Sequence, residues 1–303
     1  MPEGPVPAAS VAPVARLHVV RPGALTTVQD AGRPGRAHLG VGRSGVLDGP
    51  AARLANRLLG NAPGAAVLEA TATGCAVRPD APVVAVVGGA GCRVTVDGRP
   101  VAWGVPVRVP AGAVLDVGPA VTGLRSCLAF AGGLEPEAVL GSRSADLLSG
   151  LGPAPLREGD VLPLGTPTPG GPPPIGPVPW PGAPAELVLP VHLGPRDAWF
   201  TEASLRILLT ADYRVSSRSN RIGLRTDGPA LERSRTGAVA ELPSEGVVLG
   251  AIQVPPDGRP VVFLNDHPTT GGYPVVGVVP EAALAAAGQA VPGTRLRFVR
   301  AWA

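Results

Sequence analysis

Short apolar runs separated by turn residues form the dominant pattern along this chain. In the first half they fall at 83–87, 93–96, 105–109, 114–117 and 124–130, with Gly88-Gly89, Asp97-Gly98 and Ala111-Gly112 among the residues between them. In the second half they fall at 187–193, 213–216, 247–252, 261–264, 275–279 and 295–299. Apolar runs bounded by turn residues predict β-strands, and Asp-Gly between two of them predicts a tight hairpin. The regular spacing favours barrels or sandwiches over a parallel doubly wound sheet.

Helical patterns are few. We predict helices over 50–59, 202–209 and 281–287, and the second is preceded by Thr201 as its N-cap. Leu205, Leu208 and Leu209 are expected to form its buried stripe, and Gly288 is expected to end the third helix. The fold class that follows is mainly β, a β-rich α+β protein with a few short helices.

A proline-rich segment divides the chain. Residues 167–184 hold nine prolines and predict an extended connector between two β-rich subdomains, over 16–166 and 185–303. Residues 1–15 contain an acidic residue, several prolines and no apolar core, so they predict a disordered tail and not a signal peptide. The charge-free stretch over 162–185 is too rich in proline for a membrane helix.

Composition excludes several chemistries. All 26 basic residues are arginine, so the chain offers no lysine for a Schiff base, for a P-loop or for covalent attachment of biotin. Any bound anion must therefore be held by arginine, backbone N–H groups or hydroxyls. A net charge of +3 with 3% aromatic residues argues against a nucleic-acid site. The mean hydropathy of +0.25 favours a large core over general disorder.

The cysteines and histidines predict no metal site. Cys75, Cys92 and Cys127 lie in apolar stretches without a neighbouring cysteine at metal-binding spacing, and the four histidines are isolated. Buried reduced thiols indicate a cytoplasmic protein.

Loops rich in polar residues carry the candidate chemistry. The segment 25–35 offers Thr26, Thr27, Gln29, Asp30 and Arg33, which fit either a turn with a local ion pair or a binding loop.

The next two loops surround predicted turns or helix starts. In 41–50, Asp48 suits an N-cap, whereas Arg43-Ser44 between two glycines suits an anion site. In 141–150, Ser142, Ser144 and Asp146 favour structural capping.

The richest loop, 263–274, directly follows an apolar strand. Asp266 is a candidate base, His267 titrates near neutral pH, and the Thr-Thr-Gly-Gly backbone that follows is a candidate nest for an anion. A polar hairpin loop is the alternative. Its candidate site residues are Asn265, Asp266, His267, Thr269, Thr270, Gly271, Gly272 and Tyr273.

Two further segments add polar candidates. In 216–229, Asn220 and Arg221 lie among arginines that form either a solvated face or an anion clamp. In 244–260, Glu245 precedes an apolar strand, and Gln253 points either to solvent or into a pocket.

These segments also resemble a known family. LTTVQDAGRPG, SGVLD, GSRSADL, SNRIGLRTDGP, SEGVVLGAIQVPPDGRP and NDHPTTGGYP occur here in one order over about 17–300. They closely resemble the biotin-dependent carboxyltransferase family, in the type represented by the C subunit of bacterial 5-oxoprolinase (PxpC), also called KipA or allophanate hydrolase subunit 2. The resemblance implies two subdomains with cyclophilin-like β-barrel character.

The resemblance implies a component of an enzyme. It implies that the chain joins a KipI-like protein, the B subunit, and the A subunit of 5-oxoprolinase. That complex uses ATP with Mg²⁺ to open 5-oxo-L-proline to L-glutamate, and the chain is expected to be inactive alone. Two alternatives share the resemblance. One is the carboxyltransferase component of a urea or amide carboxylase, with biotin supplied by another protein. The other is a non-catalytic regulator that binds a KipI-like kinase inhibitor.

Residue chemistry suggests roles within such a site. Arg221 and Arg33 are candidates for an anion clamp, and Asp266 and Gln253 for orienting the lactam. Which chain binds ATP is left open.

Overall fold

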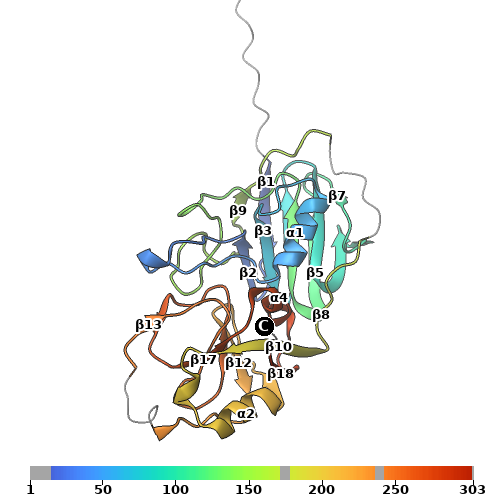
Figure 1. Ribbon diagram of the computed structural model, residues 1–303. Helices are drawn as coiled ribbons and strands as arrows, with labels where there is room; N and C mark the ends of the chain where they lie inside the picture. Colours follow the sequence, from blue (N-terminus) through green and yellow to red (C-terminus); the bar gives the residue numbers. More distant parts are fainter. Residues whose placement is uncertain (1–14, 171–177, 236–241, 302–303) are drawn as a thin grey trace, which may run out of the picture.

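Two β structures meet in the computed structural model, which describes residues 15–170, 178–235 and 242–301. An open, curled sheet lies above a closed barrel, and helix α4 lies where they meet (Figure 1). The prediction of a mainly β fold with a few short helices is confirmed. The sheet and the barrel lie on either side of the expected connector, and the expected tail at 1–15 falls almost wholly outside the described residues.

The N-terminal sheet is antiparallel and encloses the first apolar core. Its strands run in the order β2-β3-β8-β4-β1-β9, with β5 paired to β6, β7 and β8. Leu17, Leu68, Val77, Leu128 and Phe130 are fully buried within it. The bounds are β1 Arg16–Arg21, β2 Leu25–Gln29, β3 Val67–Thr71, β4 Cys75–Pro79, β5 Val83–Val96, β6 Arg99–Val101, β7 Val107–Val109, β8 Leu115–Phe130 and β9 Val161–Pro163.

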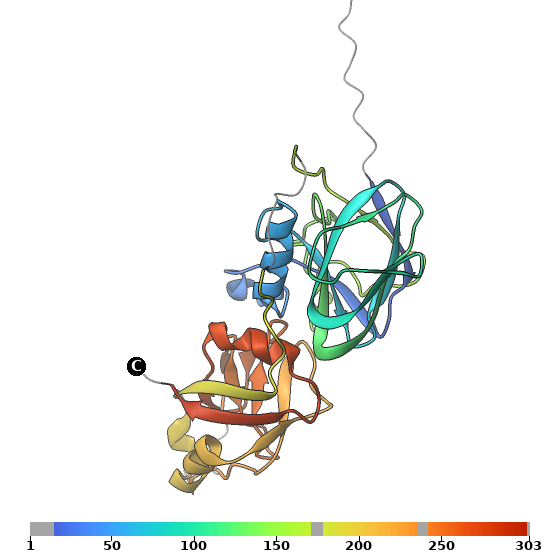
Figure 2. The ribbon, with the colours of Figure 1, turned by 90° about the vertical axis from the view of Figure 1, so that its right-hand side faces the viewer.

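Two predicted strand breaks are wrong. Gly88-Gly89 does not separate two strands, because β5 continues through it, and β8 likewise joins the two runs expected at 114–117 and 124–130. The β5–β8 pairing shifts register between Gly89 and Val94, so this part of the sheet contains bulges. Bulges bend a strand, and the sheet curls strongly along these strands (Figure 2). The Asp97-Gly98 hairpin is confirmed, since Val96 pairs with Arg99 and both turn residues have positive φ.

The second half forms a closed barrel. Strand β10 pairs in parallel with β18, and the remaining strands close the circuit in the order β10-β17-β14-β15-β12-β11-β18. Val191, Leu224, Ile252, Val262 and Phe298 are buried in its core. The bounds are β10 Glu186–Leu193, β11 Tyr213–Val215, β12 Gly223–Asp227, β14 Ala251–Gln253, β15 Val261–Phe263, β17 Val275–Val278 and β18 Arg295–Arg300; β13 Glu245–Gly246 and β16 Thr270–Gly271 form a separate ribbon.

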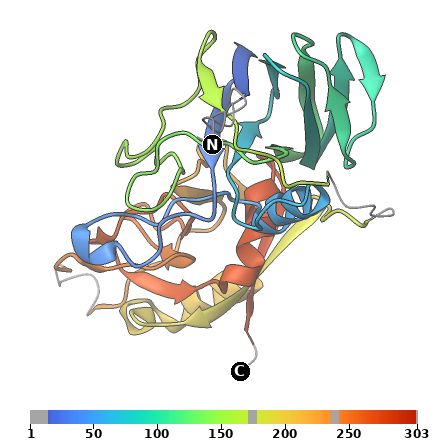
Figure 3. The same ribbon diagram turned by 90° about the horizontal axis from the view of Figure 1, so that it is seen from above.

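Each predicted helix is present, with small changes. The α-helices are α1 Gly49–Leu58, α2 Glu202–Thr210 and α4 Glu281–Gln289, with 3-10 turns η1 Ala37–Leu39 and η2 Asp197–Trp199. Asp48 caps α1 and Thr201 caps α2, as expected. In α2 the buried face holds Ser204 and Leu208, whereas Leu205 and Leu209 are only half-buried. Viewed from above, α1 and α4 lie close to the line where sheet and barrel meet (Figure 3).

Gly288 does not end α4. The helix continues to Gln289, and a Cβ at Gly288 would lie 3.1 Å from the Leu47 Cβ. The glycine therefore permits close approach of α4 to the N-terminal half and is not a helix stop.

Part of the connector packs on the N-terminal sheet. The Trp180 indole donates to the Gly104 carbonyl at 2.9 Å and lies 5.3 Å from the Trp103 ring. Residues 171–177 of the expected connector lie outside the described residues. Among the helices of the described chain, none is long and apolar enough to cross a membrane.

Candidate active site at the junction

Loops from both halves converge between the sheet and the barrel. The Ser44 N–H donates to the Asn265 carbonyl at 2.8 Å, and the Leu147 N–H donates to the Asp266 carboxylate at 3.1 Å. The Val46 N–H bonds to the Asp30 carbonyl at 3.0 Å. The structure thus brings together the predicted loops 25–35, 41–50, 141–150 and the first part of 263–274.

Asp30 organises this junction on the N-terminal side. Its carboxylate accepts hydrogen bonds from the hydroxyls of Ser142 and Ser144, both at 2.6 Å, and from the Arg143 N–H at 2.6 Å. Arg33 does not form the local ion pair with Asp30 considered from the sequence. Its buried guanidinium donates instead to the carbonyl of Ser144. Asp30 and Arg33 therefore both hold loop 141–150 in place.

A buried ion cluster joins the two halves. Arg221, 1% exposed, donates to both oxygens of Asp266 at 2.9 and 3.0 Å, and also to Glu69 on β3. It further donates to the Gly45 carbonyl at 2.7 Å. Glu69 accepts from the Leu47 N–H at 2.8 Å, so it holds the segment before α1 as well.

The cluster keeps Arg221 charged. Burial alone would lower the pKa of Arg221, but the carboxylates of Glu69 and Asp266 raise it above its ordinary value. Burial raises the pKa of Asp266, and the bonds from Arg221 and the Leu147 N–H act in the opposite direction. The bidentate geometry favours the ionised pair.

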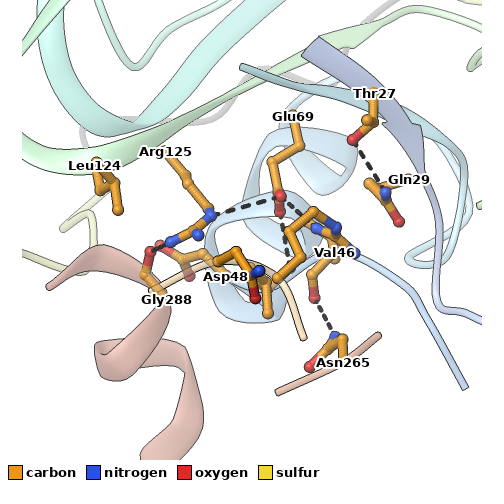
Figure 4. Close-up of polar contacts among 12 residues, drawn as sticks. Thr27, Gln29, Val46, Asp48, Glu69, Leu124, Arg125, Asn265 and Gly288 are labelled. Atoms are coloured by element: carbon orange, nitrogen blue, oxygen red, sulfur yellow. Dashed lines mark hydrogen bonds and ion pairs between the residues drawn. The ribbon is translucent and has the colours of Figure 1, made fainter. Parts of the chain in front are cut away.

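A second set of contacts lies beside the first (Figure 4). Arg125 on β8 donates to the Gly288 carbonyl of α4 and lies 3.7 Å from Glu69. Gln289 accepts from the N–H groups of Leu124 and Arg125 at 2.9 and 3.0 Å, and it donates to Asp48 at 2.7 Å. Burial lowers the pKa of Arg125 to about 10. Helix α4 is therefore fixed to the N-terminal sheet by buried polar bonds.

Sequence reasoning missed Glu69, Arg125 and Gln289. A signal was available, because Glu69 interrupts the apolar strand Val67–Thr71 and Arg125 lies inside another apolar strand. Charged residues are almost never fully buried unless they are paired. Their partners in the other half of the chain are 152 to 241 residues distant, however, so spacing alone did not identify them.

The loop after β15 is ordered by its own contacts. The Asn265 amide donates to the carbonyls of Gly45 and Val46 at 3.1 and 3.0 Å. His267 is buried, stacks on Phe263, and has a ring nitrogen 2.6 Å from the Pro268 carbonyl. Burial lowers the pKa of His267 despite that contact, which favours the neutral ring.

The later part of that loop lies apart from the ion cluster. Thr270 and Gly271 pair with Glu245 and Gly246 as a short ribbon, and the Thr269 carbonyl accepts the Val247 N–H. The candidate nest therefore uses part of its backbone in pairing. Gly272 and Tyr273 are exposed at the end of this loop.

Three other candidates have local partners. Gln253 is 7% exposed and donates to the Tyr273 carbonyl at 3.1 Å, so it faces the loop and not solvent. Glu245 pairs with Arg196 at 2.7 Å. Asn220 is exposed, and its side-chain oxygen accepts from the Ile222 N–H at 2.9 Å.

The candidates on β2 are buried beside a cavity. The Thr26 hydroxyl donates to the Pro22 carbonyl at 2.7 Å, and Thr27 accepts from the Gln29 amide at 3.0 Å. Gln29 lines a cavity of about 200 Å³ next to the start of α1. Ser44, also buried, has a φ of 52°, a strained value for a residue with a side chain. Strained backbone is common at functional sites.

The cysteines of the described chain are free thiols. Burial raises the pKa of Cys75 to about 12, so this thiol stays protonated at neutral pH. Across the described ranges, no three His, Cys, Asp or Glu side chains converge in a way that could hold a metal ion.

The chain is similar to known proteins over nearly its whole length. The model of the family "Carboxyltransferase domain, subdomain A and B" matches residues 39–300. The chain is 36% identical to the 5-oxoprolinase C subunit of Escherichia coli over 94% of its length and 91% of that protein. It is 34% identical to urea amidolyase of Lachancea kluyveri over 93% of its length, but it spans only 17% of that protein.

Solved structures agree with the fold. The crystal structure of TTHA0988 superposes with a TM-score of 0.84 at 36% identity, over 98% of this chain and 60% of that one. The Kluyveromyces lactis urea carboxylase superposes with a TM-score of 0.86 at 31% identity, over 95% of this chain and 27% of that one. The chain therefore belongs to the carboxyltransferase-domain family, subdomains A and B, and is a homologue of the 5-oxoprolinase C subunit.

Proposed function

We propose that this chain is the C subunit of an ATP-dependent 5-oxoprolinase, which opens 5-oxo-L-proline to L-glutamate together with the A and B subunits. The observation that carries this proposal is the match to the Escherichia coli protein over nearly the full length of both chains. The name of that relative implies other subunits, so we expect activity only in the assembled complex.

Hydrolysis of a lactam requires that the amide is held in a fixed orientation in a site from which bulk water is excluded. A lactam is a stable amide, and its hydrolysis becomes easier when the carbonyl oxygen is activated and water is otherwise excluded. The junction offers buried loops held at fixed positions by Asp30, Glu69 and Arg221. We assign Arg221 and Asp266 a positioning role: they hold loops 42–48 and 265–267 against each other.

The residues present do not fit a triphosphate at this junction. Arg221, Arg33 and Arg125 already donate to protein carboxylates or carbonyls, and the chain has no lysine. A phosphate clamp needs arginines or amides that are free to turn toward it. We therefore propose that ATP binds away from this junction, and we assign none of the junction residues to it.

A carboxyltransferase acting on urea or a related amide is the second candidate. It is favoured by the identity to urea amidolyases and by the superposition on urea carboxylase. Without a lysine the chain cannot carry biotin on its own side chain, so a biotinylated carrier would have to come from another protein.

The two candidates are separated by reconstitution. The chain is co-purified with the A and B subunits, and product is measured with 5-oxoproline or urea, with and without ATP, avidin and a biotinylated carrier. We expect glutamate release from 5-oxoproline that requires ATP and is insensitive to avidin. Carboxylation of urea that is blocked by avidin, without glutamate release from 5-oxoproline, would favour the second candidate instead.

A further inference from the structure

A cavity at the start of α1 is not explained by the packing of the junction. It lies between the end of β2, the first turns of α1 and the loop at 63–65, and its volume is about 200 Å³. An apolar protein cavity of about 150 Å³ is enough to bind benzene. This cavity therefore has room for one small ring.

The walls of the cavity are mainly apolar, and they include polar groups whose capacity for hydrogen bonds or ion pairs is not fully satisfied. Val46, Ala52 and Pro63 supply apolar surface, and Gln29 and Arg53 supply polar groups. Binding sites for small molecules commonly combine such walls with a few placed polar groups.

Gln29 contributes a buried acceptor that has no partner. Its amide nitrogen donates to Thr27 at 3.0 Å and to the Ala145 carbonyl at 3.1 Å, and these bonds fix its orientation. Its oxygen is turned away from Thr27 (Figure 4), and within the described chain it accepts no hydrogen bond although the residue is fully buried. A buried acceptor of this kind is rare, and it indicates a missing donor.

Arg53 contributes a cation at the edge of the cavity. It lines the cavity and is exposed on α1, and within the described residues it interacts electrostatically with Asp48 and Glu281 without forming a close ion pair. An arginine at the rim of a small cavity suits a ligand carboxylate. Arg57, one turn later on the same helix, is also exposed but does not line the cavity.

We propose that this cavity binds the lactam substrate, a five-membered cyclic amide that carries a carboxylate. The ring N–H donates to the Gln29 oxygen after a small shift of that side chain, which has no accessible surface in this structure. The carboxylate pairs with Arg53, and the ring methylenes pack against Val46, Ala52 and Pro63. The proposal rests on the proposed function, because it names the subsite of this chain for that substrate.

Binding of chemically related probes tests the cavity directly. Isothermal titration calorimetry without ATP is carried out on the full chain and on its complex with the A and B subunits. The probes are 5-oxoproline, 2-pyrrolidone, which lacks the carboxylate, and 5-oxotetrahydrofuran-2-carboxylate, the lactone in which a ring oxygen replaces the N–H. We expect 5-oxoproline to bind in at least one of the two preparations, and each of the other probes to bind about tenfold or more weakly.

Variants assign that binding to the cavity. Arg53→Ala should weaken 5-oxoproline binding about tenfold or more, whereas Arg57→Ala should leave it unchanged. Gly64→Val places a side chain between Gly64 and Ala31, whose Cβ lies 3.4 Å from a Cβ built at Gly64, and should also reduce binding. Equal thermal unfolding midpoints for the three variants would show that each one folds.

The outcomes separate the subsite from the function. Unchanged binding in folded Arg53→Ala and Gly64→Val, or no 5-oxoproline binding to chain or complex, would overturn the subsite. ATP-dependent glutamate release by that same complex would still uphold the proposed function. Binding that depends on Arg53, in a complex that never releases glutamate, would uphold the subsite and contradict the function.

Discussion

At the scale of single residues, buried charged side chains connect the N-terminal sheet to the barrel. Arg221 binds Glu69, Asp266 and the Gly45 carbonyl while almost fully shielded from solvent. The anion clamp expected for Arg221 from the sequence stays a prediction, but its donors are already engaged. Removing it would leave the buried Asp266 carboxylate without its cation, and Glu69 with only Arg125 at 3.7 Å.

Arg221→Ala is therefore expected to lower the free energy of unfolding by about 3–5 kcal/mol, because breaking one side of a buried ion pair leaves an uncompensated charge. Chemical denaturation of the purified chain measures this value. Arg218→Ala is the matched control, since Arg218 is exposed and lies 3.8 Å from Asp227, and it should cost about 1 kcal/mol or less. Similar small losses for both variants would contradict the structural role.

The buried His267 predicts how the stability of the folded chain depends on pH. Burial lowers its pKa in the folded chain, so the unfolded chain binds the proton more readily. The folded chain therefore keeps its stability above the unfolded pKa of about 6.5 and loses stability as pH falls below it. His267→Gln should flatten this part of the curve of unfolding free energy against pH. An unchanged slope in folded His267→Gln would contradict this reading of the buried ring.

At the scale of elements, the pattern of apolar runs predicted helices α1, α2 and α4 and every barrel strand except β12. In the first half it missed β1 to β4 and β9, it treated 25–29 as part of a loop, and it did not show where strands join. Gly-Gly suggested a turn at 88–89, and the structure instead has a bulge within one long strand. Sequence pattern does not distinguish these outcomes, because both need backbone freedom; the difference is set by the approach of β8. In the same way, Gly288 suggested a helix end and instead lies against Leu47.

Two left-handed glycines test this distinction. Gly89 has a φ of 77° and a Cβ there would lie 2.5 Å from the Arg125 carbonyl oxygen, whereas Gly98 has a φ of 74° and open space around it. Gly98→Ala should cost about 1–2 kcal/mol from backbone strain alone. Gly89→Ala should cost about 1–3 kcal/mol more, because the neighbouring backbone must also move. Equal losses in thermal or chemical unfolding would argue against the bulge contact.

At the scale of the whole molecule, the candidate site was only partly predictable. The sequence identified the loops that meet, including Asp30, Ser44 and Asp266, because these loops contain more polar side chains than a simple turn requires. It did not identify Glu69, Arg125 or Gln289, whose partners come from the other half of the chain. Contacts of that kind depend on how the sheet and the barrel pack together.

The packing predicts that the sheet and the barrel unfold together. Gln289 bonds to Asp48, Leu124 and Arg125 across the junction, so scanning calorimetry of the wild-type chain should show one transition. Gln289→Leu should broaden it or divide it in two. Glu281→Gln removes only an exposed pair with Arg43 and should retain one transition. Two separate transitions in the wild type would contradict the coupling.

The proposed function makes this chain a required part of a lactam-opening enzyme. Its most direct test is glutamate release from 5-oxoproline by the purified subunits, with this chain present or omitted, and with or without ATP. We expect release only when the chain and ATP are both present. Equal release by the A and B subunits without this chain, or none from a folded complex with ATP, would contradict it.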